Sequence, residues 1–380
     1  MTGVQTCALP ICHLEEGAAL ARAIGRPYIE VGCLAQLAFA SRIRSFPISR
    51  QRCHEAIALA ERHGWGAEPP IAPALITLAS SLVWTGEFDE AERWLQRTVT
   101  ALQTDTGPDI RHLLHLVAGR LNAGLGRHQE ALEEIVAAED LRSQMAGSHA
   151  LASQVTGWKI ATQARLGLTG EARAGLEALT DAEATAGEIR NARAAICLAE
   201  GDPAAALEAL QEVLVGTASA TGVVTVVEAQ LLAAHAHRGL DDQRAANTAT
   251  ERALTLAEPD HRILPFAMTG ARELLEALPR HETAHAALLV AILDVLCGAP
   301  AATHDQLPLN VEKLSPAELR VLRYLSTNLS RHQIAEELAV SPHTINTHLR
   351  KIYMKLGVGD RSSAVQRARE LRLLAAAHAR

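Results

Sequence analysis

A polar stripe near the C-terminus has residue types that can read the edges of DNA bases. The stripe has the helical spacing i, i+3, i+4, i+7 and consists of His343, Asn346, Thr347 and Arg350. An arginine can donate two hydrogen bonds to guanine, and an asparagine can pair with adenine in the same way. Apolar residues with the same period occupy the opposite face, at Ile345, Leu349 and Ile352. The pattern predicts a helix that is anchored in a core and reads DNA from its outer face.

A second pattern, HETAH at residues 281–285, has the spacing of a zinc peptidase site. On a helix, His281 and His285 would share one face and Glu282 could act as a general base. Because Pro279 lies two residues before His281, however, the pattern starts a helix instead of lying within one. No strong third ligand follows it. We therefore favour a polar helix start and expect neither a metal site nor catalytic residues, with a zinc peptidase as the weaker alternative.

Signatures of several other classes are missing from the sequence. No lysine follows a glycine, which excludes a P-loop, and no GxSxG pattern occurs. No apolar run reaches the roughly 18 residues of a membrane span, so we expect no contact with a membrane. The six cysteines form no CxxC pair, which favours free thiols in a reducing cytoplasm.

Charge is distributed unevenly along the chain. Residues 314–380 carry eleven Lys and Arg against five Asp and Glu, a net charge of +6. The whole chain has a net charge of −7, so the rest carries −13. A small basic module on a large acidic body indicates nucleic-acid binding at one end, although a solvated basic helix face would give the same count.

The body, residues 13–297, has a helical pattern throughout, as in the segments 88–102 and 128–141. A glycine followed five positions later by an alanine recurs at Gly86, Gly126, Gly167 and Gly201; after Gly239 the alanine comes one position later, at Ala245. Glycine suits the left-handed end of a helix, and alanine lets two helices approach closely. The recurrence resembles the tetratricopeptide pattern without its strict 34-residue period. We predict an all-α chain whose body is a tetratricopeptide-like α-solenoid.

Four tryptophans lie in the first half of this array, at Trp65, Trp84, Trp94 and Trp158. They could line a groove for an inducer or a protein partner. Packing between helices is the interpretation we favour, because large aromatic side chains are mostly core residues.

After a linker at residues 298–313, the segment 314–380 has clear helix starts. They are the capping boxes at Ser315 and Ser330, the Ser341-Pro342 pair and Asp360. Gly357 would end the third helix. Ile334, Ala335 and Leu338 would complete a small core, and only two residues separate the second helix from Ser341. This is the layout of a helix-turn-helix, with a small protein-binding module as the alternative.

Residues 314–374 resemble a LuxR-type helix-turn-helix domain over its whole length. The blocks QIAEEL, VSPHTINTH, IYMKLGV and AVQRARELRLL carry the resemblance. The ending, together with a helical-repeat body, is similar to the large ATP-binding MalT-like regulators. The resemblance implies a four-helix domain that binds double-stranded DNA, and a transcriptional regulator that works with RNA polymerase.

The resemblance also implies roles for individual residues. Base contacts fall on Asn346, Thr347 and Arg350. Phosphate contacts fall on Ser341, His343, Thr344, Lys351, Lys355 and Arg361. The fourth helix would form the dimer contact, through Val365 and Ala368.

Two positions depart from the family pattern. Asn346 stands where the family usually has lysine, which removes one charge; the site that is read could differ, and its salt dependence should be weaker. Asn328 replaces a customary glycine, so that loop could differ in shape.

The first twelve residues, MTGVQTCALPIC, lack helical periodicity and do not form a secretory signal. Residues 2–11 match the translation of a common sequencing-adapter oligonucleotide. We interpret residues 1–12 as a non-native tail, including Cys7 and Cys12, fused to the C-terminal part of a longer protein. MalT-like regulators carry an ATPase module before the repeats, so we expect ATP to belong to that missing module and this chain to bind no cofactor.

The sequence therefore predicts a cytoplasmic bacterial transcription regulator whose repeats sense or relay a signal and whose C-terminal domain binds DNA. The family resemblance adds a homodimer on DNA as a possible arrangement. The alternative is a repeat adaptor for protein partners with a vestigial C-terminal module. The inducer, the operator and the oligomeric state do not follow from the sequence.

Overall fold

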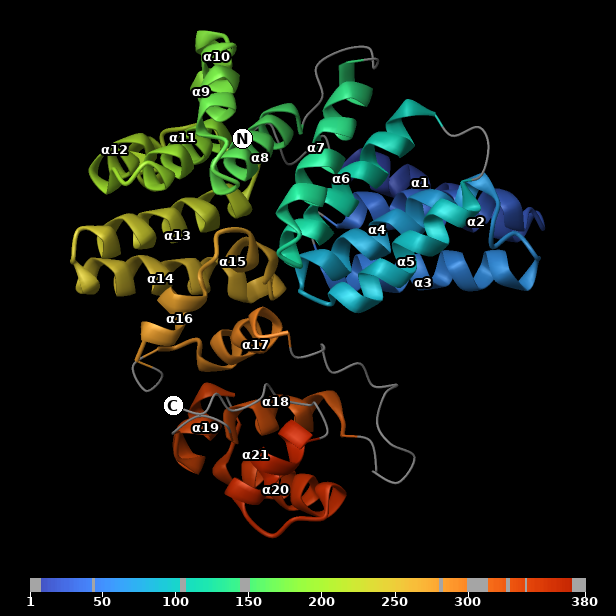
Figure 1. Ribbon diagram of the computed structural model, residues 1–380. Helices are drawn as coiled ribbons and strands as arrows, with labels where there is room; N and C mark the ends of the chain where they lie inside the picture. Colours follow the sequence, from blue (N-terminus) through green and yellow to red (C-terminus); the bar gives the residue numbers. More distant parts are fainter. Residues whose placement is uncertain are drawn as a thin grey trace.

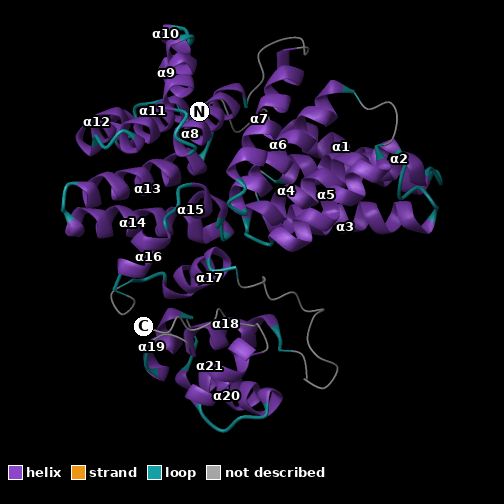
Figure 2. Ribbon diagram, in the orientation of Figure 1, coloured by secondary structure: helices purple, strands orange, loops and turns teal. Residues whose placement is uncertain are grey.

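The computed structural model describes residues 8–42, 45–102, 107–143, 151–279, 283–298, 314–325, 329–338 and 340–370. Within these ranges every regular element is a helix and no strand occurs (Figure 2). The all-α prediction is therefore confirmed. The five cysteines in the described ranges are free thiols, as expected. None of the helices in the same ranges is long and apolar enough to cross a membrane.

Antiparallel helix pairs succeed one another through the body of the molecule (Figure 1). The first half contains α1 (Ala8–Ala23), α2 (Pro27–Ser41), α3 (Phe46–Arg62), η1 (Pro69–Ile71), α4 (Ala72–Trp84), α5 (Phe88–Ala101), α6 (Pro108–Gly124) and α7 (His128–Ser143). The second half contains α8 (Ala152–Arg165), α9 (Thr169–Glu177), α10 (Asp181–Ala184), α11 (Gly187–Ala199), α12 (Pro203–Leu214), α13 (Val223–Gly239) and α14 (Gln243–Ala257). The segments predicted as helices at 88–102 and 128–141 are α5 and α7.

The predicted glycine–alanine unit is confirmed at four turns. Gly86, Gly126, Gly167 and Gly201 have φ values of 79°, 75°, 77° and 78°. The alanine five positions after each of them is fully buried, at Ala91, Ala131, Ala172 and Ala206. A left-handed residue ends one helix, and a small residue then allows the next helix to pack closely against it.

The fifth turn corrects the sequence interpretation. Gly239 belongs to α13, and the left-handed residue is Asp241 with φ 60°. The buried alanine is accordingly Ala246, five positions later and 1% exposed, and not Ala245. Aspartate is one of the few residues with a side chain that tolerates this conformation.

One segment crosses between the two halves of the array. After α14 and η2 (Glu258–Asp260), α15 (Leu264–Met268) folds back against α4, α6 and α13. The backbone N–H of Ile263 donates to Trp84 O at 2.8 Å. Leu264 and Phe266 are fully buried. The body is therefore not a purely linear solenoid, in which each repeat contacts only its neighbours.

Two of the four tryptophans pack around a buried arginine near this crossing. The Trp84 and Trp158 rings lie 6.1 Å apart, with the Arg120 guanidinium 5.2 Å and 4.5 Å from their centroids. Trp84 and Trp158 are 8% and 3% exposed, whereas Trp65 and Trp94 are partly buried. All four belong to or contact the first core cluster, which supports the packing interpretation. Trp158 also lines a cavity beside α11 and α13.

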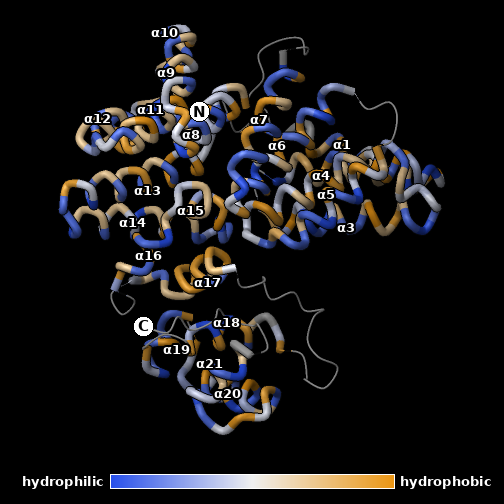
Figure 3. The backbone as a smooth tube through the Cα atoms, viewed as in Figure 1, coloured by the Kyte–Doolittle hydropathy of each residue, from blue (hydrophilic) through white to orange (hydrophobic). Residues whose placement is uncertain are grey.

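The array ends with α16 (Arg272–Ala277) and α17 (Ala286–Leu296), and residues 299–313 lie outside the described ranges. The C-terminal domain consists of α18 (Pro316–Leu325), α19 (Arg331–Glu337), α20 (Pro342–Leu356) and α21 (Arg361–Glu370). The strongly apolar α17 (Figure 3) packs against α18, and Ala286 belongs to the core of the C-terminal domain. This contact leaves α20 on the side of the domain that faces away from the repeats (Figure 1).

Candidate nucleic-acid interface

Helix α20 is positioned by strong local signals at both ends. Ser341 is the N-cap, and its Oγ accepts a hydrogen bond from Thr344 N at 3.1 Å. Pro342 is the first helical residue, and Gly357 ends the helix with φ 67°. The other predicted starts are confirmed as well, since the capping boxes at Ser315 and Ser330 form both of their hydrogen bonds and Asp360 accepts from Ser363 N.

The inner face of α20 fixes the orientation of the helix. Ile345 and Ile352 are fully buried and Leu349 is 3% exposed, as predicted. They pack with Ile334 and Ala335 of α19, and Leu338 is partly buried at the same core. Because these contacts hold one face of α20, the opposite face must point to solvent.

The outer face carries the predicted stripe. His343, Asn346, Thr347 and Arg350 are all exposed. The Thr347 hydroxyl donates to His343 O at 3.0 Å, whereas Asn346 and Arg350 make no hydrogen bond within the part of the chain that the structure describes. Both side chains are therefore free to reach an external partner. Lys351 is exposed in the same way.

The remaining phosphate candidates at the start of α20 serve its N-cap. The Ser341 and Thr344 hydroxyls lie 2.8 Å apart, and Ser341 Oγ also caps the helix. The first N–H groups of a helix lack intrahelical partners and attract anions. This end of α20 can thus offer backbone N–H groups as well as side chains to a phosphate.

Lys355 lies in a different environment from Lys351. Its Nζ is 2.9 Å from Glu318 Oε2, and the two side chains are only 14% and 5% exposed. Burial would raise the pKa of Glu318, but the Ser315 backbone hydrogen bond and the Lys355 ammonium outweigh it and lower that pKa. The structure thus places Lys355 in a link between α20 and α18, which competes with the phosphate contact that the sequence predicts for it.

Arg361 also forms internal bonds. Its guanidinium donates to Tyr324 O at 3.2 Å, Leu325 O at 3.0 Å and Leu329 O at 2.6 Å. These carbonyls lie at and just after the end of α18, where helical partners are missing. These bonds tie α21 to α18, and the phosphate contact of Arg361 stays a prediction.

The two residues predicted for the dimer contact face inward. Ala368 is fully buried, and Val365 packs against the same core. In this arrangement Ala368 does not lie on a surface, because α21 covers α18 and α20 with that face. Val365 is only half-buried, so its dimer contact, like dimerisation itself, stays a prediction.

Sequence reasoning missed Met354. It follows Arg350 by four residues and Thr347 by seven, and its side chain is 66% exposed. An apolar side chain there can contact a thymine methyl group. The i+4 and i+7 spacing from the stripe was the available signal. Arg331 and His332, exposed at the start of α19, were also not predicted as phosphate contacts.

Only part of the HETAH pattern can be located, because His281 and Glu282 lie outside the described residues. His285 is the N-cap of α17, so the pattern does precede a helix. Its Nδ1 is 2.7 Å from Glu258 Oε2 and its Nε2 is 2.9 Å from Thr255 Oγ1. Both ring nitrogens thus have protein partners. Among the described residues, no group of three His, Cys, Asp or Glu is placed to hold a metal.

Comparison with known proteins agrees with the geometry of the C-terminal domain. Residues 312–368 match the family described as bacterial regulatory proteins, luxR family. Over 71 residues the chain is 45% identical to the HTH-type transcriptional regulator MalT of Serratia proteamaculans (strain 568) and 44% identical to that of Yersinia pestis. Each match covers 18% of this chain and 8% of the relative. The similarity therefore extends over a small part of these relatives.

Proposed function

From the LuxR-family helix-turn-helix domain at residues 312–368, we infer that the chain is a sequence-specific DNA-binding regulator of transcription. The observation that carries this proposal is the outer face of α20. Asn346 and Arg350 are exposed and make no hydrogen bond among the described residues, on a helix whose opposite face is held in the core.

In the proposed complex α20 lies in the major groove. Arg350 donates to guanine, Asn346 pairs with a base edge such as that of adenine, and Thr347 contacts a neighbouring base. Met354 extends the same face by one turn and packs against thymine methyl groups. The position of α20, away from the repeats, leaves room for a duplex (Figure 1).

Phosphates are bound around this helix. Phosphates of one strand contact the N-terminal N–H groups of α20 together with Ser341, His343 and Thr344. Lys351 contacts a phosphate farther along the same strand. The basic charge of the module and the acidic charge of the body keep DNA at one end of the chain. Two copies of the chain would bind half-sites roughly one helical turn apart.

The remaining parts of the proposal concern the whole regulator. The repeats receive a signal, the DNA-bound form acts with RNA polymerase, and the protein works in the cytoplasm, where the bacterial chromosome lies. ATP belongs to a further module and not to the repeats or the C-terminal domain.

Selection from a random duplex pool by the 380-residue chain, repeated across a salt series, tests this function. We expect enrichment of a defined site, and a loss of that enrichment in Arg350→Ala. Arg244→Ala, in α14 of the repeats, is the matched control and should retain the same site. Weak binding that is steeply salt-dependent and enriches no sequence would contradict the proposal and move the function to the repeats.

A further inference from the structure

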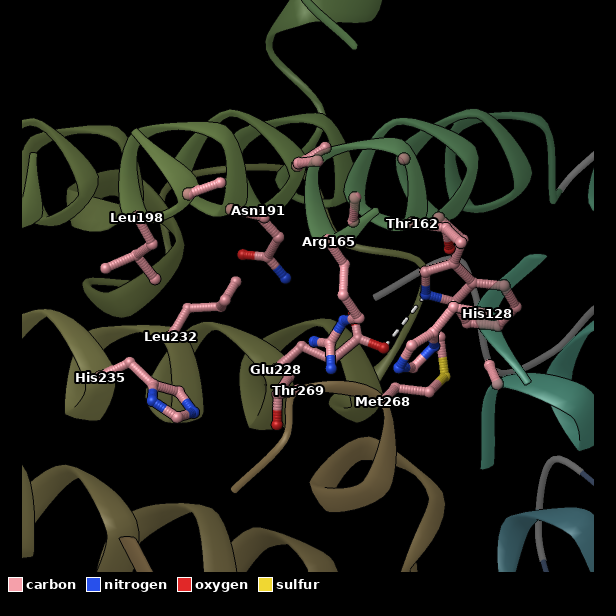
Figure 4. A pocket seen from close by; sticks show the side chains of 18 of the residues that line it. His128, Thr162, Arg165, Asn191, Leu198, Glu228, Leu232, His235, Met268 and Thr269 are labelled. Carbon is pink, nitrogen blue, oxygen red and sulfur yellow. Dashed lines mark hydrogen bonds between the residues drawn. The ribbon is translucent and has the colours of Figure 1, made fainter. Parts of the chain in front are cut away.

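A cavity of about 760 Å³ opens in the second half of the repeats (Figure 4). Helices α8, α11 and α13 form its walls, and Met268 and Thr269 of the crossing segment contribute to its lining. Pockets for small organic molecules typically measure roughly 300–1,000 Å³. The cavity therefore has the volume of a ligand site and lies far from the DNA-reading face.

Small residues create this space. The walls of the cavity include Gly157, Ala161, Ala164, Ala192, Ala195 and Ala199. A Cβ atom at Gly157 would come within 2.7 Å of Glu188 O, so the close approach of α8 and α11 requires glycine there. Close helices with short side chains leave a stable space, because the backbone has no room to collapse further.

Arg165 is the one fixed positive charge that projects into the cavity from these walls. The residue as a whole is exposed, yet partial burial of its guanidinium lowers the pKa of Arg165, and it makes no ion pair or hydrogen bond with any residue that the structure describes. Burial lowers the pKa of His128 and lowers that of His235 to about 4, and the Arg165 charge adds to both effects. Both imidazoles are consequently neutral at pH 7. A guanidinium without a carboxylate partner, next to two neutral imidazoles, is suited to an anion. Two carboxyls also line the cavity: Glu188 accepts hydrogen bonds from Thr221 N and Thr225 Oγ1, and burial raises the pKa of Glu228 to about 7.

Unpaired hydrogen-bonding atoms also line the cavity. Asn191 is 4% exposed, and its Nδ2 donates to Thr225 O at 2.8 Å. Its Oδ1 is buried and has no partner among the described residues, and the same is true of His235 Nε2. A buried acceptor without a partner is costly, so such atoms commonly mark a site for water or a ligand. Asn191 also lies within hydrogen-bonding reach of Glu228, and its Oδ1 is open to a donor from a bound molecule.

We propose that this cavity binds a small organic anion, whose carboxylate or phosphate pairs with Arg165 and whose hydroxyl or amine donates a hydrogen bond to Asn191 Oδ1. The neutral imidazoles of His128 and His235 supply further hydrogen bonds to the anionic group. Binding stands independently of DNA recognition. The role of the bound anion as the signal for the regulator rests on the proposed function.

Isothermal titration of the 380-residue chain with four six-carbon probes tests this proposal. Gluconate and glucose 6-phosphate carry both an anionic group and hydroxyls, hexanoate carries the anion alone, and glucose carries hydroxyls alone. We expect binding of gluconate, glucose 6-phosphate or both, and at least about tenfold weaker binding of hexanoate and glucose. The stronger of the first two identifies the anionic group.

Variants locate the site. Arg165→Gln should weaken binding of the preferred probe at least about tenfold, and Asn191→Ala should reduce the preference over hexanoate. Arg173→Gln, an exposed arginine on α9 that pairs with Glu200, is the control and should bind as the unchanged chain does. Absence of heat with all four probes at 10 mM, a concentration of about ten times a 1 mM Kd, would overturn the proposal. Equal affinity in Arg165→Gln would overturn it as well.

The same variants keep this proposal separate from the function of the C-terminal domain. Arg165→Gln should select the same DNA site as the unchanged chain in the absence of any probe. A variant that loses probe binding but keeps DNA selection tests the cavity proposal alone. An unchanged chain that selects no DNA site contradicts the proposed function and leaves the cavity proposal untouched.

Discussion

The DNA-reading face and the cavity of the repeats both present polar side chains to a binding partner, but they are built in opposite ways. Asn346 and Arg350 lie four residues apart on one exposed helix. Arg165, Asn191 and Glu228 come from three helices, and the fold brings them around one interior space. In the first region the helix period alone places the groups. In the second, tertiary packing places them and also changes their protonation.

The largest expected effect concerns protonation in the cavity. Burial raises the pKa of Glu228 to about 7, with further effects from Trp158, Glu188 and Arg120. Between the ordinary pKa near 4.5 and about 7 the folded chain binds more protons than the unfolded chain, so stability falls as pH rises through that window. The loss should be about 3 kcal/mol. Glu228→Gln cannot ionise and so does not lose this stability. The melting temperature of the variant, relative to that of the unchanged chain, should therefore be higher at pH 8 than at pH 5.

An equal difference in melting temperature at the two pH values would show that Glu228 titrates as an ordinary carboxyl. The contrast between the solvated DNA face and the desolvated cavity would then be lost. Glu208→Gln, on the neighbouring helix α12, serves as the control.

The next effect tests whether Arg361 serves the fold of the C-terminal domain. Arg361→Ala removes the hydrogen bonds to the carbonyls of Tyr324, Leu325 and Leu329 and should lower the stability of this domain by about 2–3 kcal/mol. Hydrogen exchange should therefore accelerate in α18 and α21 and stay unchanged in the repeats. Arg331→Ala, at an exposed position, should leave exchange as it is. Unchanged exchange in Arg361→Ala would return Arg361 to the set of free phosphate contacts.

Arg350→Ala should act on recognition without acting on stability. We expect a loss of about 1–3 kcal/mol in binding to the selected site, together with relaxed preference at one base pair. Fluorescence anisotropy on the selected duplex and on single-base variants of it measures both. A uniform loss on all duplexes would mean that Arg350 contacts phosphate and not a base.

The smallest effect separates two lysines on the same helix. Lys351→Ala should weaken binding to every sequence and reduce the slope of log K against log salt by about 1. Lys355→Ala should leave that slope unchanged, because its ammonium is paired with Glu318. Lys355→Ala should instead destabilise the domain, because it removes the ion pair with Glu318. The destabilisation should shrink as pH falls through the lowered pKa of Glu318, because protonated Glu318 no longer forms that pair in the unchanged chain. Equal slopes for the two variants would contradict the distinction.

The sequence-based prediction succeeds where the interactions are local. The starts at Ser315, Ser330 and Ser341 were found because a capping hydrogen bond spans three residues. The inner and outer faces of α20 followed from the helix period. Gly86 and its equivalents were found because a left-handed turn strongly selects for glycine.

The prediction fails where partners are distant in sequence. Lys355 and Glu318 are 37 residues apart, and Arg361 bonds carbonyls 32 to 37 residues away, so their spacing gave no signal. The burial of Ala368 depends on how α21 docks. The cavity was not predicted because no single segment contains its lining. The turn at Asp241 was placed two residues too early, at Gly239, because aspartate stands where glycine was expected.

The bond from Ile263 to Trp84 also has a consequence for the order of events during synthesis. These residues are 179 positions apart, and the first core cluster is completed by Leu264 and Ala267. At roughly 5–20 residues per second, a ribosome takes about 10–35 s to make the intervening chain. During that interval the first half of the array is exposed without its final side chains. A chaperone that shields nascent apolar surface would therefore act during this interval. A premature stop between the two positions would release a chain whose first core cluster is incomplete.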